Sequence, residues 1–224
     1  MQTLRILTVL ALMASFASLA ACESASTSRS STADTATSPD SADTPVVEGT
    51  GPAPSVDEAI EVVIETSLGS IVLELDPAVA PITVANFLKF VDAGHYTDTL
   101  FHRVISDFMI QGGGFDTAYQ QKETDGGIQS EADIAPSNRR GTVAMARTAD
   151  PHSASAGFFI NVVDNTFLDH TAKTADGWGY TVLGEVIEGM DVVDAIKVVP
   201  TGAAGPLSTD APQEQVVIQS VARR

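Results

Sequence analysis

The stretch that says most about the fold is FHRVISDFMIQGGGF, residues 101–115. It contains two short runs rich in apolar, aromatic and β-branched residues, and such runs are typical of strands. We therefore predict strands at Leu100–Ile105 and Phe108–Gln111. The rest of the domain repeats this pattern of short apolar runs separated by turn residues.

The same stretch concentrates residues that can do chemistry. Side chains alternate between the two faces of a strand, so Arg103 and Ile105 share one face, and Met109 and Gln111 share a face of the next strand. This arrangement predicts a guanidinium beside an apolar surface. The glycines 112–114 are not followed by the Lys-Ser/Thr of a phosphate loop. We interpret them as backbone that needs positive φ or a close approach.

Further strands and two helices are predicted on either side of this stretch. The runs Glu61–Thr66 and Ile71–Leu75 flank a turn and predict a β-hairpin. One helix begins near Pro81 and ends before Gly94, with apolar residues at helical spacing, and a second covers Met190–Val198. The remaining predicted strands are Gly141–Ala146, Phe158–Val163, Tyr180–Val186 and Gln215–Val221.

This order of elements lacks the regular βαβ alternation of a doubly wound sheet. It predicts a mainly β fold, a closed eight-stranded antiparallel β-barrel capped by two α-helices. A chain of 224 residues with 44% hydrophobic residues is long enough for one packed domain with attachments. Its 12 Lys and Arg against 29 Asp and Glu give a net charge of -17, which would repel a phosphate backbone, so nucleic acid is excluded as a partner.

The N-terminus predicts export and anchoring. Residues 1–21 contain Arg5 and then an uncharged run that ends in small residues, the layout of a signal peptide. The sequence Leu19-Ala20-Ala21-Cys22 resembles the bacterial lipobox, which implies that Cys22 becomes lipidated. The alternative is a plain signal peptide cleaved elsewhere, with Cys22 incidental. Because Cys22 is the chain's single cysteine, an internal disulfide is excluded.

Residues 22–56 predict a flexible linker between the membrane and the domain. Between Ser24 and Pro45 there are twelve Ser or Thr among 22 residues and no aromatic residue. Such a segment cannot bury enough apolar area to offset its ordering entropy. The folded domain is therefore expected to cover residues 57–224.

Four blocks of the domain resemble the cyclophilin family of peptidyl-prolyl cis-trans isomerases, in particular its bacterial periplasmic branch. The blocks are residues 101–115, VAMART at 143–148, FFINVVDNTFLDH at 158–170 and YTVLGEVIEGMDVVDAI at 180–196. The resemblance runs in order from about Glu61 to Val221. It implies an eight-stranded barrel closed by two helices, a hydrophobic proline pocket on its outer face, and no metal or cofactor.

The resemblance also implies roles for individual residues. Arg103 is the expected catalytic arginine, and Gln111 is expected to orient the substrate and Arg103. Ala146 and Arg147 match the strand that pairs with the substrate backbone, and Tyr180 takes the place of a histidine at the pocket edge. The residues expected to hold the proline ring are Phe108, Met109, Phe159 and Leu168.

Two positions depart from the family pattern at the pocket edge. Gly157 stands where members commonly have glutamine, which bears on affinity and sequence preference on that side. Phe167 stands where many eukaryotic members have a tryptophan associated with cyclosporin binding. The four histidines are scattered without metal-ligand spacing, so no metal site is expected.

The resemblance favours one interpretation of residues whose roles the sequence alone leaves open. By themselves, Phe108, Phe159 and Leu168 fit a plain barrel core, and Arg103 fits a solvated strand arginine. With the resemblance, we predict an isomerase of X-Pro bonds in exported polypeptides, a monomer in the bacterial cell envelope that faces the periplasm and is held to the membrane only by its lipid. The alternatives are a non-catalytic module that binds proline-containing segments and, more weakly, a small-molecule barrel of the lipocalin type.

Overall fold

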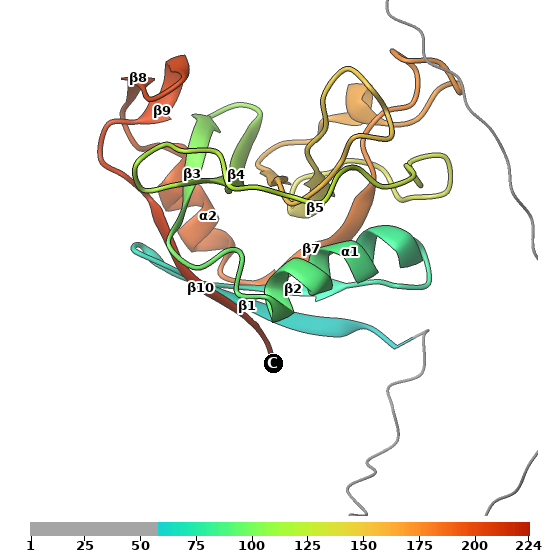
Figure 1. Ribbon diagram of the computed structural model, residues 1–224, viewed down its shortest axis with the longest axis horizontal. Helices are drawn as coiled ribbons and strands as arrows, with labels where there is room; N and C mark the ends of the chain where they lie inside the picture. Colours follow the sequence, from blue (N-terminus) through green and yellow to red (C-terminus); the bar gives the residue numbers. More distant parts are fainter. Residues whose placement is uncertain (1–57) are drawn as a thin grey trace, which may run out of the picture. The chain divides into compact units, whose positions relative to one another are not determined.

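Eight strands close into a barrel in the computed structural model, which describes residues 58–224 (Figure 1). Their order around the barrel is β1-β10-β3-β4-β6-β5-β7-β2, and every neighbouring pair is antiparallel. The predicted fold class is confirmed. The barrel strands are β1 (Ile60–Thr66), β2 (Gly69–Leu75), β3 (Thr99–Ile105), β4 (Met109–Asp116), β5 (Thr142–Met145), β6 (Phe158–Asn161), β7 (Val182–Glu188) and β10 (Val217–Arg223).

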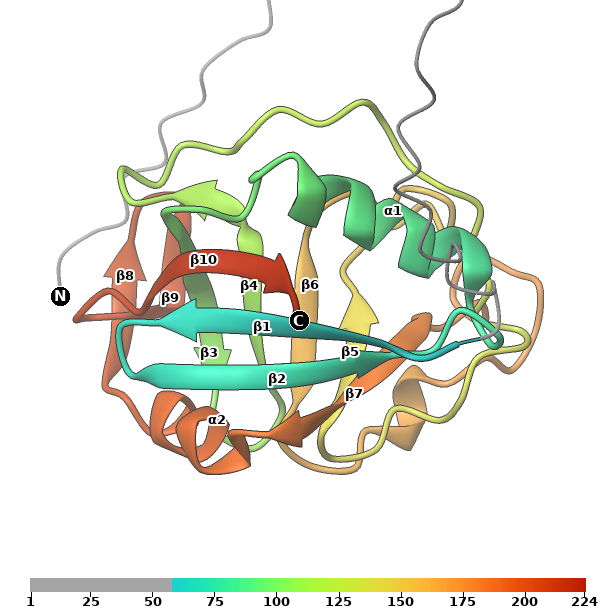
Figure 2. The same cartoon turned by 90° about the horizontal axis from the view of Figure 1, so that it is seen from below.

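The two predicted helices are α1 (Pro81–Asp92) and α2 (Met190–Lys197), and they lie on opposite sides of the barrel strands (Figure 2). The buried side of α1 includes Val84, Phe87 and Leu88, which follow the apolar spacing seen in the sequence. Proline occupies the first turn of α1, where its missing N–H has no intrahelical partner to lose. A short 3-10 helix, η1 (Thr166–Leu168), was not predicted.

A hairpin outside the barrel was also absent from the prediction. It consists of β8 (Thr201–Ala204) and β9 (Leu207–Pro212), which pair with each other, and β9 packs against β3 (Figure 2). The turn between them contains Gly205 at φ 54°, and a Cβ there would lie 2.4 Å from the Tyr119 Cβ. Glycine is therefore required at this turn.

The glycines of the central stretch continue β4 rather than end it. The strand was predicted to end at Gln111 but runs on to Asp116. Gly113 has φ 82°, and a Cβ on it would lie 2.8 Å from a ring carbon of Tyr96. Both reasons given for these glycines, positive φ and close approach, are therefore confirmed at Gly113.

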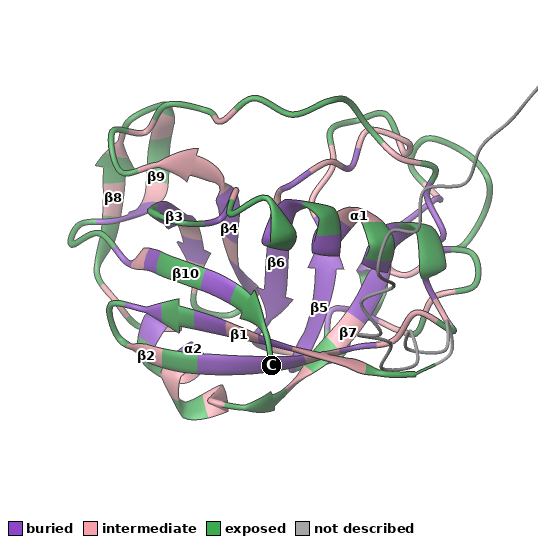
Figure 3. Ribbon diagram, turned by 60° about the horizontal axis from the view of Figure 1, so that its bottom comes forward, coloured by how far each residue is buried: buried purple, intermediate pink, exposed green. Residues whose placement is uncertain are grey.

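Two apolar clusters lie on the two faces of the barrel wall. Ile110 and Ile160 belong to the interior core, whereas their strand neighbours Met109 and Phe159 belong to a second cluster. Because neighbouring residues of a strand face opposite ways, this second cluster lies on the outer face. Strands β5 and β6 are accordingly buried at every residue, whereas β10 alternates with exposed residues (Figure 3).

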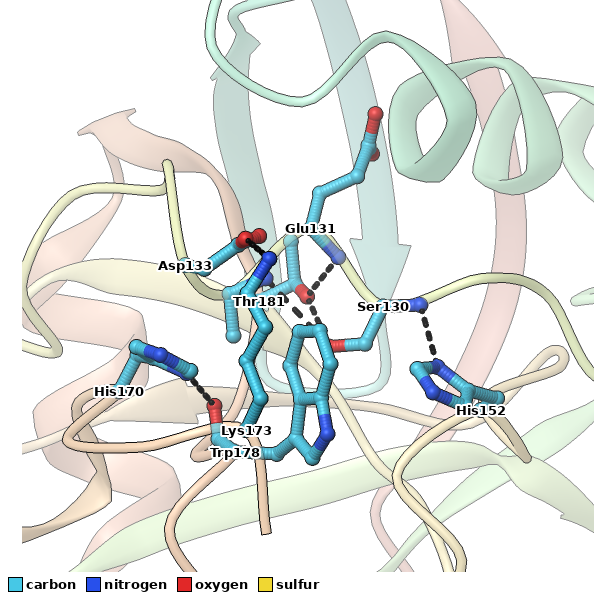
Figure 4. Close-up of polar contacts among 9 residues, drawn as sticks. Ser130, Glu131, Asp133, His152, His170, Lys173, Trp178 and Thr181 are labelled. Atoms are coloured by element: carbon cyan, nitrogen blue, oxygen red, sulfur yellow. Dashed lines mark hydrogen bonds and ion pairs between the residues drawn. The ribbon is translucent and has the colours of Figure 1, made fainter.

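The N-terminus of α1 is capped by a residue distant in sequence. Ala80 at the N-cap position provides no side-chain hydrogen bond. Instead the Glu131 carboxylate accepts hydrogen bonds from the Ile82 N–H at 3.0 Å and from the N–H and hydroxyl of Thr83 at 2.8 and 2.7 Å. The Glu131 N–H in turn donates to the Thr181 hydroxyl at 3.2 Å (Figure 4). Glu131 thus joins α1 to the chain segment that leads into β7.

We expect Glu131→Ala to lower the free energy of unfolding by about 2 kcal/mol, because it leaves buried donors of α1 without an acceptor. For a domain of this size, that corresponds to a fall in Tm of roughly 4–8 °C. Thermal unfolding followed by circular dichroism measures the change. Glu123→Ala, which removes an exposed carboxylate of the same connecting segment, is the matched control, and an equal fall in both variants would contradict the capping role.

The predicted signal peptide (residues 1–21), Cys22 and the predicted linker (residues 22–56) lie outside the described residues. Within residues 58–224, neither the length nor the apolar character of any helix suffices to cross a membrane.

Candidate active site

A pocket of about 380 Å3 opens on the outer face of the barrel, over the second apolar cluster. It is bounded by β3, β4, β6, β9, η1 and the segments that follow β5 and precede β7. Segments far apart in the sequence therefore meet at one surface. The lining residues are His102, Arg103, Phe108, Met109, Gln111, Phe115, Ala146, Arg147, Phe159, Leu168, Tyr180 and Leu207.

The structure brings all the predicted site residues of the domain to this pocket except Phe167. That side chain is 73% exposed and stacks on Phe108, with ring centroids 5.6 Å apart. Phe167 thus lies beside the pocket without lining it. The lining residues that the sequence did not single out are His102, Phe115 and Leu207.

The floor of the pocket is apolar and closely packed. Met109, Phe159 and Leu168 are 2%, 4% and 8% exposed and belong to one cluster. The Tyr180 ring meets Phe159 edge-on, with centroids 5.6 Å apart. These side chains form a buried apolar cluster that is separate from the interior core of the barrel.

The polar wall of the pocket is built on the pairing of β3 with β4. Arg103 and Gln111 are direct partners in the register, so their side chains emerge together. Arg103 Nη1 donates to Gln111 Oε1 at 3.5 Å, and Arg103 Nε lies 3.6 Å from Asp210 Oδ2 of β9. The Arg103 side chain is 35% exposed. A partly desolvated guanidinium therefore stands at the edge of an apolar floor.

His102 is a buried titratable group next to this guanidinium. It is 4% exposed, and its ring packs against Phe115 with centroids 4.7 Å apart. Burial, and to a smaller extent the charge of Arg103, lower the pKa of His102 from 6.5 to about 4. The imidazole is therefore neutral near pH 7 and adds no second positive charge beside Arg103.

Arg147, another residue that lines the pocket, is held in place by three contacts. Its Nε donates to the Gly179 carbonyl at 2.9 Å, and its Nη1 donates to the Thr148 carbonyl at 2.9 Å. Its guanidinium lies over the Tyr180 ring, 4.5 Å from the centroid. These contacts fix Arg147 and Tyr180 to each other.

Three buried asparagines form hydrogen bonds with one another and with the backbone of pocket residues. The sequence analysis did not identify them. Asn165 Nδ2 donates to the Phe108 carbonyl at 2.8 Å and to Asn161 Oδ1 at 2.7 Å. Asn138 Nδ2 donates to the Tyr180 carbonyl at 3.2 Å. Because all three are at most 2% exposed, this network fixes the backbone on both sides of η1.

Gly157 leaves one edge of the pocket open. It lines an adjoining cavity of about 180 Å3, which shares Gln111 and Arg147 with the main pocket. A Cβ at Gly157 would have Ala146 Cβ as its nearest neighbour, at 3.5 Å, an ordinary van der Waals contact. Glycine is therefore not sterically required here, and the position has room for a larger side chain.

No group of three or more His, Cys, Asp or Glu side chains within residues 58–224 is arranged to hold a metal ion.

Comparison with known proteins identifies the family to which this site belongs. Residues 61–223 match the family model described as cyclophilin type peptidyl-prolyl cis-trans isomerase/CLD. The chain belongs to the cyclophilin family. Peptidyl-prolyl cis-trans isomerase cyp18 of Streptomyces antibioticus is 62% identical over 157 residues, 70% of this chain and 94% of that protein. Peptidyl-prolyl cis-trans isomerase B of Escherichia coli is 52% identical over 160 residues, 71% of this chain and 97% of that protein.

A solved structure agrees with the cyclophilin fold. The crystal structure of a Cryptosporidium parvum cyclophilin covers 75% of this chain and 98% of its own, with a TM-score of 0.60 and 23% sequence identity. The same protein in the presence of the dipeptide Ala-Pro gives a TM-score of 0.59 at 24% identity. Family membership and the bacterial relatives make this cyclophilin a peptidyl-prolyl cis-trans isomerase.

Proposed function

We propose that the pocket over Met109 and Phe159 holds the proline ring of a polypeptide substrate while Arg103 stabilises the twisted X-Pro amide. The observation that carries this proposal is the guanidinium of Arg103, paired with Gln111, at the edge of an apolar pocket. A proline ring is apolar and needs such a floor. The reacting amide needs a donor beside it.

The chemistry of the amide explains why an arginine suits this position. Rotation about the prolyl bond crosses a barrier of about 18–20 kcal/mol because it destroys amide resonance. In the twisted transition state the prolyl nitrogen regains a lone pair, which can accept a hydrogen bond. A donor fixed at that point binds the transition state better than either planar ground state. Arginine stays protonated throughout the physiological pH range.

The other lining residues are assigned supporting roles in this proposal. Met109, Phe159 and Leu168 hold the ring and exclude water, which strengthens the electrostatic effect of Arg103. Gln111 orients Arg103 through its side-chain oxygen. Ala146 and Arg147 follow β5 directly, where an extended substrate can pair with the backbone. Residues that touch the substrate without taking part in bond rotation are expected to change KM more than kcat.

Isomerase activity accounts for this site better than a non-catalytic binding module does. The apolar floor alone suffices to bind a proline ring, whereas a guanidinium fixed beside it by Gln111 is also placed to stabilise the twisted amide. The lipocalin reading is wrong for this fold, because side chains such as Phe101 and Phe158, each 0% exposed, fill the barrel interior. A protease-coupled assay on a proline-containing peptide tests the enzyme reading, and wild-type protein that gave no acceleration would favour the binding module.

We further propose that the protein is a lipoprotein that acts on exported polypeptides as a monomer. The signal-like N-terminus, the lipobox-like Leu19–Cys22 and the Ser/Thr-rich residues that follow support this proposal. A cyclophilin needs no ATP, which suits folding outside the cytoplasm. The lipid is the expected link to the membrane of the cell envelope.

In a bacterial host, we expect the mature chain to begin at acylated Cys22 and to sediment with membranes. Several acyl chains hold a protein stably, so the attachment should resist high salt and yield to detergent. Cys22→Ser should abolish lipidation, whereas Ser26→Ala, a neighbouring change, should not. Intact-mass measurement checks this, and an unmodified mature wild-type chain would refute the anchor.

A further inference from the structure

Asp210 contacts the proposed catalytic arginine from outside the barrel. It lies on β9, and its Oδ2 is 3.6 Å from Arg103 Nε. The two side chains are 34% and 35% exposed, so neither is fully hydrated. This contact is separate from the Gln111 contact, which is made to Nη1. Gln111 on β4 and Asp210 on β9 therefore contact two different nitrogens of one guanidinium, the first through a hydrogen bond and the second as an ion pair.

The backbone at Asp210 adopts a conformation that is strained for a residue other than glycine. Its φ is 64°, in the left-handed region that a side chain rarely adopts. Glycine would adopt this conformation without strain, and aspartate tolerates it better than most residues. Backbone strain of this kind tends to occur at functional sites. The chain thus places a carboxylate where glycine would be easier to accommodate.

The hairpin that carries Asp210 is held firmly against the barrel. The Gln213 N–H donates to the Pro200 carbonyl at 2.8 Å and closes the base of the hairpin. Gln215 Nε2 donates to the Thr117 carbonyl at 2.8 Å, which ties the segment beyond β9 to the segment beyond β4. Leu207 at the other end of β9 lines the pocket. β9 packs against β3, and the hydrogen bonds that close the hairpin and tie the segment beyond it do not involve Arg103.

An arginine side chain has four rotatable bonds, and a single acceptor at 3.5 Å leaves much of that freedom. The ion pair with Asp210 at Nε adds a second contact, which further restricts rotation of the guanidinium. Neither contact uses Nη2, so donors remain for a substrate. The carboxylate also reduces the positive potential at Arg103, but partial exposure screens this effect. We expect that fixing the orientation of the Arg103 guanidinium increases catalysis more than the lower positive potential decreases it.

We propose that Asp210 is a positioning residue that holds the Arg103 guanidinium in its productive orientation, so that the hairpin β8–β9 forms part of the active site. This inference rests on the proposed role of Arg103. An ion pair this exposed contributes little to stability, so its effect is expected to be on catalysis.

The test uses Asp210→Gly and Asp210→Asn in the full-length chain. Glycine relieves the strain at φ 64°, so Asp210→Gly should keep or raise Tm while lowering kcat about threefold to fivefold and leaving KM within twofold. Asp210→Asn keeps the shape without the charge and should lower kcat by a smaller factor. Glu214→Ala, an exposed carboxylate just beyond the hairpin, should behave like wild type and controls for net charge.

A double-mutant cycle separates positioning from other effects. In an Arg103→Ala background, Asp210→Gly should lower kcat no further, because the group it positions is gone. An equal loss in both backgrounds, or an Asp210→Gly enzyme as fast as wild type or faster, would overturn the inference. If Arg103→Ala itself were as active as wild type, the proposed role of Arg103 would fail instead. The two failures are therefore distinguishable.

Discussion

Replacing Arg103 by alanine should lower kcat/KM for proline-containing peptides at least tenfold while leaving the fold intact. A tenfold loss corresponds to about 1.4 kcal/mol of transition-state stabilisation. The loss should appear mainly in kcat, because the guanidinium is proposed to interact with the prolyl nitrogen only when the amide is twisted. The fold should survive because Arg103 is partly exposed and its partner Asp210, 34% exposed, can be hydrated in its absence.

Arg103→Lys is the informative companion to this variant. Lysine keeps the charge but lacks the planar fork that contacts Gln111 and Asp210 simultaneously. Its kcat/KM should therefore fall between wild type and Arg103→Ala. Peptide turnover followed by a protease-coupled assay measures both variants, with circular dichroism as the check on folding. A folded Arg103→Ala protein with wild-type kcat/KM would show that the guanidinium does not stabilise the transition state.

The barrel was predictable because its strands follow a simple rule. Each predicted barrel strand begins within about two residues of the observed one, since β-branched and aromatic residues gather where a pleated surface is half buried. The helix at Pro81 was equally clear from its apolar spacing and from the proline in its first turn. Residue propensity, apolar spacing and a proline in the first turn all act over a few neighbouring residues, so they can be recognised in a single sequence.

The hairpin β8–β9 carries no such signal. Thr-Gly-Ala-Ala at 201–204 has no large apolar residue, and β9 contains a proline and Asp210 at positive φ. Its strands pair because contacts with β3 and closure at Gln213 hold them in place. A tertiary contact therefore overrides weak β propensity. The residue we infer to position Arg103 lies in the one pair of strands that the sequence did not predict.

The pocket was predictable only through the family resemblance. Strand alternation predicts that Arg103 shares a face with Ile105 and Gln111 with Met109, but the pairing of Arg103 with Gln111 comes from the structure. Nothing local indicates that Leu168 and Tyr180 meet them on the outer face. The buried asparagines were missed for the same reason. Asn138 and Asn161 are neighbours in space but 23 residues apart in sequence, and an isolated asparagine in a sequence reads as a turn residue.

We expect His102 to make the stability of this domain sensitive to acid. The native state holds the pKa of His102 at about 4 through burial, against an ordinary value of 6.5. Between these two values the unfolded chain binds a proton that the native state does not bind. Stability therefore rises with pH across this window. The contribution of His102 is fully present above pH 6.5 and is lost as the pH falls toward 4.

The expected size of this loss is about 3 kcal/mol, from a pKa difference of about 2.5 at 1.36 kcal/mol per unit. Other groups also titrate in this range, so the measurement is the difference between wild type and His102→Phe in urea unfolding at several pH values between 4 and 7. Phenylalanine keeps the ring that packs on Phe115 but cannot be protonated. Its stability should vary less steeply with pH.

A second variant, His102→Asn, separates protonation from packing. Asparagine loses the contact with Phe115, so His102→Asn should be less stable than His102→Phe at pH 7. Both variants should nevertheless show the same shallow dependence on pH, because neither can bind the proton. Slopes as steep as that of wild type would show that another group causes the acid sensitivity. A shallow slope in both would show that His102 causes the acid sensitivity. Its burial keeps it unprotonated in the native state, so the unfolded chain, which can bind the proton, is favoured as the pH falls below 6.5.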